Sequence, residues 1–264
     1  MARAAVAAAA AVGAVGAVGT MMLRPAAPLA SAQPPVTVSA AVSLTDVLEE
    51  SARGFRDAGG GDLRFNFAGS NVLARQIVNG APVDLFISAD EAQMRVVEDA
   101  GLVTTGTRID LLGNHLAVVR SRAAPPIADA ASLAQPVLRR IALGDPEAVP
   151  AGAYAKQWLE RAGQWDGVAA KVVPVANVRA ALAAADAGTV DAAIVYESDA
   201  FVASSATLAF VVSGPAAPRI VYPAAVLAKA RNRDGAQRFL SYLRGAAASA
   251  IFRKYHFEPR AEQR

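Results

Sequence analysis

Four segments of the chain share one local design, in which a short apolar run ends, a turn of small residues or proline follows, and an amphipathic segment begins. Ser43 and Ser70 open two of these segments, residues 144–152 (GDPEAVPAG) form the third turn, and Asn177 stands before the fourth. Ser43, with Asp46 three positions later, also forms an approximate capping box. The pattern predicts four helices that each begin directly after a strand.

Helix starts of this kind are suited to binding an anion. The first N–H groups of a helix have no acceptor inside the helix, and the helix dipole adds partial positive charge there. Several starts that meet in one cleft would bind an oxyanion without any charged side chain, and serine hydroxyls would add neutral donors. The simpler interpretation is that Ser43, Ser70 and Asn177 only cap helices. Spacing along the sequence does not decide between the two.

Enzymatic chemistry is poorly represented in the sequence. A serine hydrolase needs a base beside its nucleophile, but no G-x-S-x-G motif occurs and the only histidines are His115 and His256. Asp145 and Glu147 could form a carboxylate pair, but in a D-P-E turn before a helix such residues usually stabilise the turn and the helix dipole. The sequence therefore predicts no enzyme, with a serine hydrolase as a remote alternative.

Metal and cofactor chemistry is equally unsupported. Two scattered histidines, no cysteine and no D-x-D-x-D-G loop argue against a dedicated cation site, and no cofactor is expected. The lack of cysteine also excludes disulfides, thiol catalysis and a lipid anchor on an N-terminal cysteine.

The N-terminal residues 1–32 have the pattern of a signal peptide. Arg3 is followed by an Ala/Val/Gly-rich run up to Leu23 and by an A-x-A cleavage site that ends at Ala32. An uncleaved membrane anchor is the alternative, but the run contains few strongly apolar residues. Removal of this segment lowers Lys+Arg from 26 to 24 against 23 acids, which leaves a net charge of about +1. We therefore expect an exported periplasmic protein with no nucleic-acid partner.

The rest of the chain alternates short apolar runs with amphipathic segments, which is typical of an α/β fold with mostly parallel sheets. Strands are predicted at residues 36–40, 63–67, 85–88, 115–119, 141–143, 172–175, 192–195, 208–212 and 221–227. Helices are predicted at residues 44–58, 71–79, 91–100, 152–162, 179–187, 234–244 and 246–255.

Two breaks in this alternation suggest that the chain passes between two lobes twice. One lies at Leu112–Asn114 and the other at Gly214–Pro218. We therefore predict a first lobe built from residues 33–112 and 222–264, and a second lobe from residues 113–221. A ligand between such lobes would bind at the carboxyl ends of the strands.

Six stretches give the chain a specific resemblance to a known family. They are SAAVSLT at 39–45, FAGSNVLARQI at 67–77, GAPVDLFISAD at 80–90, GDPEAVPAGAYAK at 144–156, NVRAAL at 177–182 and IVYESDA at 194–200. In this order they resemble the ModA family, the periplasmic molybdate-binding proteins of ABC transporters, along essentially the whole chain after residue 32. Val42, Gly69 and Asn71 depart from residues that are common in the family.

This resemblance implies a type II periplasmic binding protein fold, with mixed, mostly parallel sheets flanked by helices and an oxyanion held between two lobes. The implied ligand groups are the N–H and hydroxyl of Ser43 and Ser70, the N–H groups of Ala151 and Val178, and the Tyr196 hydroxyl. Asn71 is a possible accessory donor. Molybdenum would be bound only as the molybdate oxyanion, through these same residues.

The resemblance also implies what this protein does. It would be a monomer that binds molybdate or tungstate and delivers it to a membrane permease. The alternative is a binding protein for sulfate or another tetrahedral oxyanion, because only cavity size and the number of donors separate these ligands.

Overall fold

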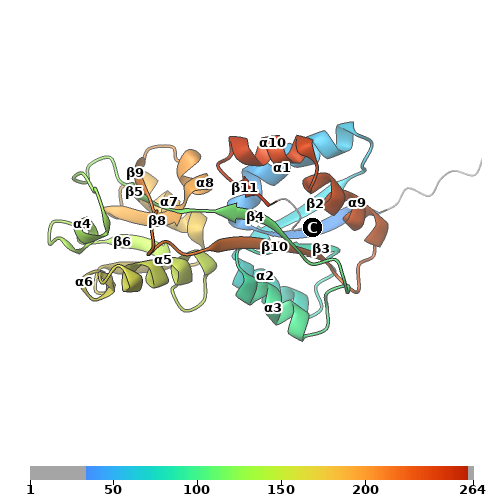
Figure 1. Ribbon diagram of the computed structural model, residues 1–264, viewed down its shortest axis with the longest axis horizontal. Helices are drawn as coiled ribbons and strands as arrows, with labels where there is room; N and C mark the ends of the chain where they lie inside the picture. Colours follow the sequence, from blue (N-terminus) through green and yellow to red (C-terminus); the bar gives the residue numbers. More distant parts are fainter. Residues whose placement is uncertain (1–33, 261–264) are drawn as a thin grey trace, which may run out of the picture. The chain divides into compact units, whose positions relative to one another are not determined.

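The structure is a computed structural model that describes residues 34–260. These residues contain two β-sheets, each flanked by helices (Figure 1). We call the six-stranded sheet with its helices lobe 1, and the five-stranded sheet with its helices lobe 2. The predicted signal peptide and its cleavage site at Ala32 lie outside the described residues.

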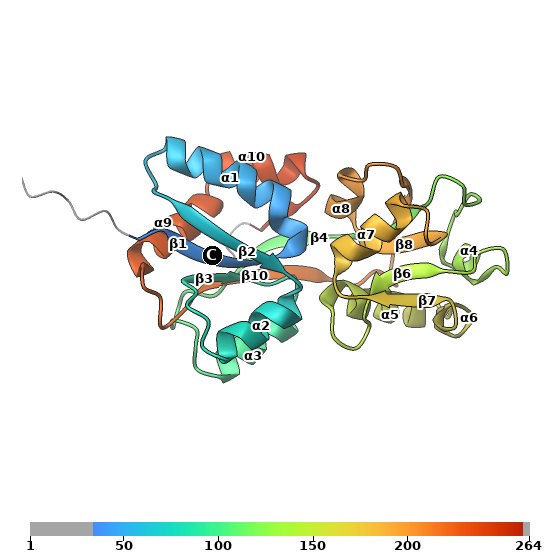
Figure 2. The ribbon, with the colours of Figure 1, turned by 180° about the vertical axis from the view of Figure 1, so that it is seen from behind.

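Lobe 1 is formed by both ends of the described chain. Its strands follow the order β11-β4-β10-β3-β1-β2. They span β1 (Val36–Ala41), β2 (Leu63–Ala68), β3 (Leu85–Ile87), β4 (Ile109–Asn114), β10 (Ile220–Val226) and β11 (Glu258–Pro259). The helices are the short 3₁₀ helix η1 (Val42–Leu44), α1 (Thr45–Asp57), α2 (Ser70–Val78), α3 (Glu91–Asp99), α9 (Arg233–Leu243) and α10 (Ala246–Lys254). Helices α1 and α10 lie on one face of the sheet, and α2 and α3 on the other (Figures 1 and 2).

Lobe 2 is formed by the middle of the chain. Its strands follow the order β7-β6-β8-β5-β9. They span β5 (Leu116–Arg120), β6 (Ile141–Gly144), β7 (Val172–Val175), β8 (Ala192–Tyr196) and β9 (Thr207–Val211). The helices are α4 (Ala130–Ala134), α5 (Pro150–Arg161), α6 (Trp165–Ala169), α7 (Val178–Asp186) and α8 (Glu197–Phe201). Helices α5 and α7 lie on opposite faces (Figure 2).

Burial explains why the strands have their sequences. The central strand β8 reads AAIVY and is buried at every position, because helices cover both faces of its sheet. The edge strand β2 instead alternates, with Leu63, Phe65 and Phe67 partly buried and Arg64 and Asn66 exposed. This alternation places one row of side chains on the core and the other in solvent.

Both sheets are mixed, as predicted. The parallel pairs are β1–β2 and β1–β3 in lobe 1, and β6–β7 and β6–β8 in lobe 2. The remaining pairs are antiparallel, including those of β10 with β3 and β4, so the parallel pairs are not the majority. Parallel pairing is found among strands that a helix follows, whereas β4 and β10 run between the lobes (Figure 1).

The chain passes from lobe 1 to lobe 2 directly after Asn114, as the predicted break at Leu112–Asn114 indicated, but the sequence predicted no strand here. These residues end the continuous strand β4, where Leu112 to Asn114 are buried between β10 and β11. Glycine and asparagine are poor strand formers, so their local propensity hid a strand that tertiary pairing stabilises. The predicted lobe boundaries at residues 112/113 and 221/222 fall inside β4 and β10.

Among residues 34–260, no helix is long and apolar enough to cross a membrane.

Gly152 illustrates how closely α5 packs on the end of β6. A Cβ atom added at this glycine would lie 1.9 Å from the backbone oxygen of Gly144. That oxygen belongs to a buried strand and has no freedom to move away. The missing side chain is therefore what allows the first turn of α5, which contains Ala151, to approach the strand end.

We expect Gly152→Ala to destabilise the fold by about 1–3 kcal/mol or more, since overpacking against backbone forces a backbone shift. Chemical denaturation of both proteins would measure the change in the free energy of unfolding. Glu160→Ala, an exposed position on the same helix, is the matched control and should lie within about 0.5 kcal/mol of wild type. Equal stability of the Gly152 variant and wild type would contradict the packing argument.

Candidate functional site

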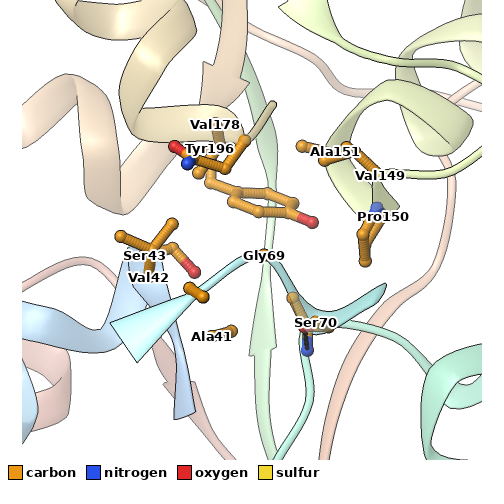
Figure 3. A pocket seen from close by; sticks show the side chains of 13 residues that line it. Ala41, Val42, Ser43, Gly69, Ser70, Val149, Pro150, Ala151, Val178 and Tyr196 are labelled. Atoms are coloured by element: carbon orange, nitrogen blue, oxygen red, sulfur yellow. Dashed lines mark hydrogen bonds between the residues drawn. The ribbon is translucent and has the colours of Figure 1, made fainter. Parts of the chain in front are cut away.

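A small pocket lies between the two lobes, at the carboxyl ends of their strands. Segments that follow β1, β2 and β3 form its lobe 1 side, and segments that follow β6, β7 and β8 form its lobe 2 side (Figure 3). Its lining residues are Ala41, Val42, Ser43, Ala68, Gly69, Ser70, Ala89, Val149, Pro150, Ala151, Asn177, Val178 and Tyr196.

The structure brings together all five residues predicted to bind an oxyanion. Ser43 and Ser70 lie on the lobe 1 side, and Ala151, Val178 and Tyr196 on the lobe 2 side. In Figure 3 their side chains surround one common space. Each of the five is at most 3% exposed, so a ligand held there would be shielded from water.

Asn71, predicted as a possible accessory donor, is not among the lining residues. Its Oδ1 lies 2.7 Å from the point that a Cβ of Gly69 would occupy, and this oxygen is buried without a hydrogen-bond partner. Asn71 therefore lies next to Gly69 and is not one of the residues that line the pocket.

Three helices of ordinary length begin at the pocket. Helix α2 begins at Ser70, α5 at Pro150 and α7 at Val178. Ser70, Ala151 and Val178 are thus in the first two helical positions, where N–H groups have no acceptor within the helix. Three helix starts that converge on one buried space supply N–H donors and partial positive charge to a single ligand.

The two serines are not helix caps, which corrects the simpler interpretation of the sequence. Ser43 lies inside η1, whose N-cap is Ala41, so the predicted capping box with Asp46 does not form. Ser70 is the first residue of α2, whose N-cap is Gly69, and neither helix has a side-chain cap. Asn177 does cap α7, because its Oδ1 accepts from the N–H of Ala180 at 3.0 Å.

Tyr196 carries a buried hydroxyl that has no hydrogen-bond partner among residues 34–260. Burial raises the pKa of this phenol well above its usual value, so the group keeps its proton. Buried polar groups in folded proteins are nearly always satisfied, and an unpaired one facing a pocket indicates a position for a ligand atom. Its place at the end of β8 gave no signal in the pattern of the sequence, and only the family resemblance identified it.

No charged side chain is among the lining residues. The cavity volume is about 10 Å³, which is far below the roughly 300–1,000 Å³ of pockets that hold drug-sized organic ligands. Neutral hydroxyl and N–H donors around a small space fit a small anion better than they fit a cation or an organic molecule.

The catalytic alternatives receive no support from the geometry. Ser43 and Ser70 are bonded to Tyr222 and to the N–H of Ala89 rather than to a histidine. His115 instead contacts Glu258 at 3.0 Å, and His256 contacts Glu197 at 2.9 Å.

The carboxylates of the D-P-E turn also have structural partners. Asp145 accepts from the N–H of Glu147, and Glu147 pairs with Lys156. Within residues 34–260, no group of three or more His, Asp or Glu side chains is placed to hold a metal ion.

One charged cluster beside the pocket was missed by the sequence reasoning. Arg179 directly follows Val178 and donates to Asp199 at 2.5 Å and to Asp46 at 2.6 Å. Arg179 and Asp199 belong to lobe 2, whereas Asp46 is on α1 of lobe 1, so the second bond joins the lobes. Burial raises the pKa of Asp199 to about 6, while the Arg179 guanidinium opposes that rise. Asp199 is therefore ionised at neutral pH.

We expect Asp46→Asn to speed ligand release about three- to tenfold, because opening of the cleft would no longer require the Arg179–Asp46 ion pair to break. Stopped-flow fluorescence of ligand dissociation would measure the rate. The matched control is Glu50→Gln, one turn along α1, where the carboxylate pairs with Lys254 of the same lobe. An identical increase in both variants would show that the effect is not due to the bond between lobes.

Comparison with known proteins places this chain in a family. Residues 36–258 match the family described as bacterial extracellular solute-binding protein. The molybdate-binding protein ModA of Escherichia coli is 39% identical over 84% of this chain and 88% of its own length. The chain belongs to the ModA family of bacterial extracellular solute-binding proteins.

Other relatives agree with this assignment. A putative ABC transporter substrate-binding lipoprotein, YvgL of Bacillus subtilis, is 35% identical over 84% of the chain and 85% of its own length. Among solved structures, the periplasmic molybdate-binding protein of Azotobacter vinelandii superposes with a TM-score of 0.75 at 26% identity, covering 84% of this chain and 98% of that one. The predicted type II periplasmic binding protein fold is thereby confirmed.

Proposed function

We propose that this ModA-family protein captures molybdate or tungstate outside the cytoplasm and delivers it to the membrane permease of an ABC transporter. The observation that carries the proposal is the buried pocket between the lobes, lined by neutral donors and by no charged side chain. The names of the ModA relatives support molybdate as the ligand. A periplasmic location and a monomeric state complete the proposal.

Neutral donors suit a protein that must bind an anion tightly and still release it. Hydrogen bonds to a charged ligand are each worth about 1.5–3 kcal/mol net, so several of them give strong binding. A buried arginine in the pocket would need a compensating charge whenever the pocket is empty. Arg179 meets this requirement outside the pocket, because two carboxylates neutralise it.

Sulfate is the ligand class that competes most directly. The sulfate-binding protein SubI of Mycobacterium tuberculosis has the same fold, with a TM-score of 0.73 at 18% identity over 85% of this chain and 86% of that one. This likeness concerns the fold alone. The higher identity to molybdate-binding proteins favours molybdate and tungstate over sulfate.

Isothermal titration of residues 33–264 tests the proposal, because residues 34–260 within them belong to one compact unit. Molybdate, tungstate, sulfate and phosphate are titrated in turn. Tight one-to-one binding of molybdate and tungstate, with little response to the other two, is the expected result. Preference for sulfate would support the oxyanion site but assign the protein to a sulfate transporter. A lack of response to all four anions would contradict the proposed oxyanion function.

A further inference from the structure

The hydroxyl of Ser43 has a buried partner that the ligand would not contact. Its Oγ lies 3.0 Å from the hydroxyl of Tyr222, which is fully buried on β10. The Tyr222 oxygen also lies 3.4 Å from Nδ2 of Asn114 on the neighbouring strand β4. The two strands that run between the lobes therefore carry a polar connection that ends at the pocket.

The direction of each hydrogen bond in this connection can be assigned. The N–H of His115 donates to Asn114 Oδ1 at 2.8 Å, which identifies the other amide atom as the nitrogen. An amide nitrogen only donates, so Asn114 Nδ2 donates to Ser198 Oγ at 2.9 Å and to the Tyr222 oxygen.

The Tyr222 hydroxyl accepts from Asn114, so its own proton must be donated to another acceptor. Among the hydrogen bonds of the described residues, the only acceptor it can reach is Ser43 Oγ. If Ser43 donated to Tyr222 instead, the phenol proton would be buried without an acceptor, which is unfavourable. Burial also raises the pKa of Tyr222 above its usual value, so the phenol keeps the proton that it donates.

Ser70, at the start of α2, has an equivalent hydrogen-bond arrangement. Its Oγ accepts from the N–H of Ala89 at 2.9 Å, and a backbone N–H can only donate. Each serine oxygen therefore accepts a hydrogen bond from the protein, and its own O–H can donate to a ligand in the pocket. For Ser70 the donor is a backbone N–H group, whereas for Ser43 it is the side chain of Tyr222.

We propose that Tyr222, oriented by Asn114, is a positioning residue that makes Ser43 an obligate donor and thereby selects oxyanions that carry no proton. This inference rests on the proposed function of the pocket. Molybdate and tungstate have only acceptor oxygens at neutral pH. Hydrogen arsenate, also a tetrahedral dianion, carries one proton that needs an acceptor.

Tyr222→Phe tests the proposal because it removes only the hydroxyl and keeps the ring, which packs against Tyr196 and Phe257. Without the Tyr222 hydroxyl, the Ser43 proton can turn away from the pocket, and a Ser43 lone pair can then face the pocket and accept from hydrogen arsenate. We expect molybdate affinity to fall about tenfold while arsenate affinity stays the same or rises. The ratio of the molybdate affinity to the arsenate affinity, measured by isothermal titration, should therefore fall by tenfold or more.

Asn114→Asp provides a second and sharper test. Its carboxylate would accept from Tyr222, so Tyr222 would accept from Ser43, and Ser43 could no longer donate to the ligand. The added negative charge repels both dianions alike and cancels in the ratio. We expect the ratio of molybdate to arsenate affinity to fall at least as much as in Tyr222→Phe.

Tyr242→Phe, on α9 of lobe 1 and outside the pocket lining, is the matched control and should leave the ratio unchanged. A wild-type protein that binds molybdate, with variants whose two affinities fall by equal factors, would overturn the role of Tyr222 alone. A wild-type protein that binds no oxyanion would overturn this inference together with the proposed function.

Discussion

Ala151→Asp is expected to weaken molybdate binding by about three orders of magnitude while leaving the fold intact. Ala151 is buried in the pocket lining, near the start of α5. A carboxylate there would lie a few ångströms from the anion, and two unit charges about 4 Å apart repel by roughly 4 kcal/mol at an effective dielectric constant of 20. Each 1.4 kcal/mol corresponds to about a tenfold change in affinity.

The same substitution should not harm the helix. An acidic side chain in the first turn interacts favourably with the helix dipole, and α5 has no acid in that turn. The dipole offsets only part of the cost of burying an unpaired carboxylate, so thermal unfolding without ligand should show a cooperative transition at a melting temperature below that of wild type.

Ala151→Asn is the matched control, because asparagine has nearly the size of aspartate but no charge. It separates steric obstruction of the pocket from repulsion of the ligand. Isothermal titration with molybdate should show a loss for aspartate that exceeds the loss for asparagine by about a hundredfold or more. If the two variants bind equally weakly, the pocket does not hold an anion at this position.

Ser70→Ala is expected to reduce molybdate affinity by roughly one to two orders of magnitude. The substitution removes a donor to a charged ligand, which is worth about 1.5–3 kcal/mol. It also removes the acceptor of the buried Ala89 N–H, so the loss should lie toward the upper end of this range. Ser43→Ala should fall in the same range.

Ser51→Ala is the control for the serine variants. Ser51 is also fully buried, but its hydroxyl donates to the carbonyl of Val47 within α1. Its loss should leave molybdate affinity unchanged. A Ser70 variant that binds as tightly as wild type would exclude this hydroxyl as a ligand group.

The larger elements of the fold could be predicted from the sequence because their signals are local. Helix α1 follows the apolar spacing of Val47, Leu48 and Phe55, and the central strands are short apolar runs. All nine predicted strands and all seven predicted helices have counterparts within a few residues. Such elements satisfy their own backbone hydrogen bonds or present one clear apolar face, so pattern alone identifies them.

The elements that were missed depend on contacts far away in the chain. Strand β4 contains Gly113 and Asn114 and exists through pairing with β10 and β11, whereas β11 contains only two residues and exists through pairing with β4. The three missed α-helices, α4, α6 and α8, have five residues each. Helices so short have little stability of their own and form only where the surrounding structure supports them.

By itself the sequence determined the family, the order of the main elements and the five residues that meet at the pocket, because these follow from local patterns and continuous motifs. Only the tertiary structure decided what each hydroxyl can do. Tyr222 lies 179 positions from Ser43, and Asp46 lies 133 positions from Arg179. Hydrogen-bond direction and ion pairing between lobes depend on which groups share a buried space, and folding alone brings such distant residues together.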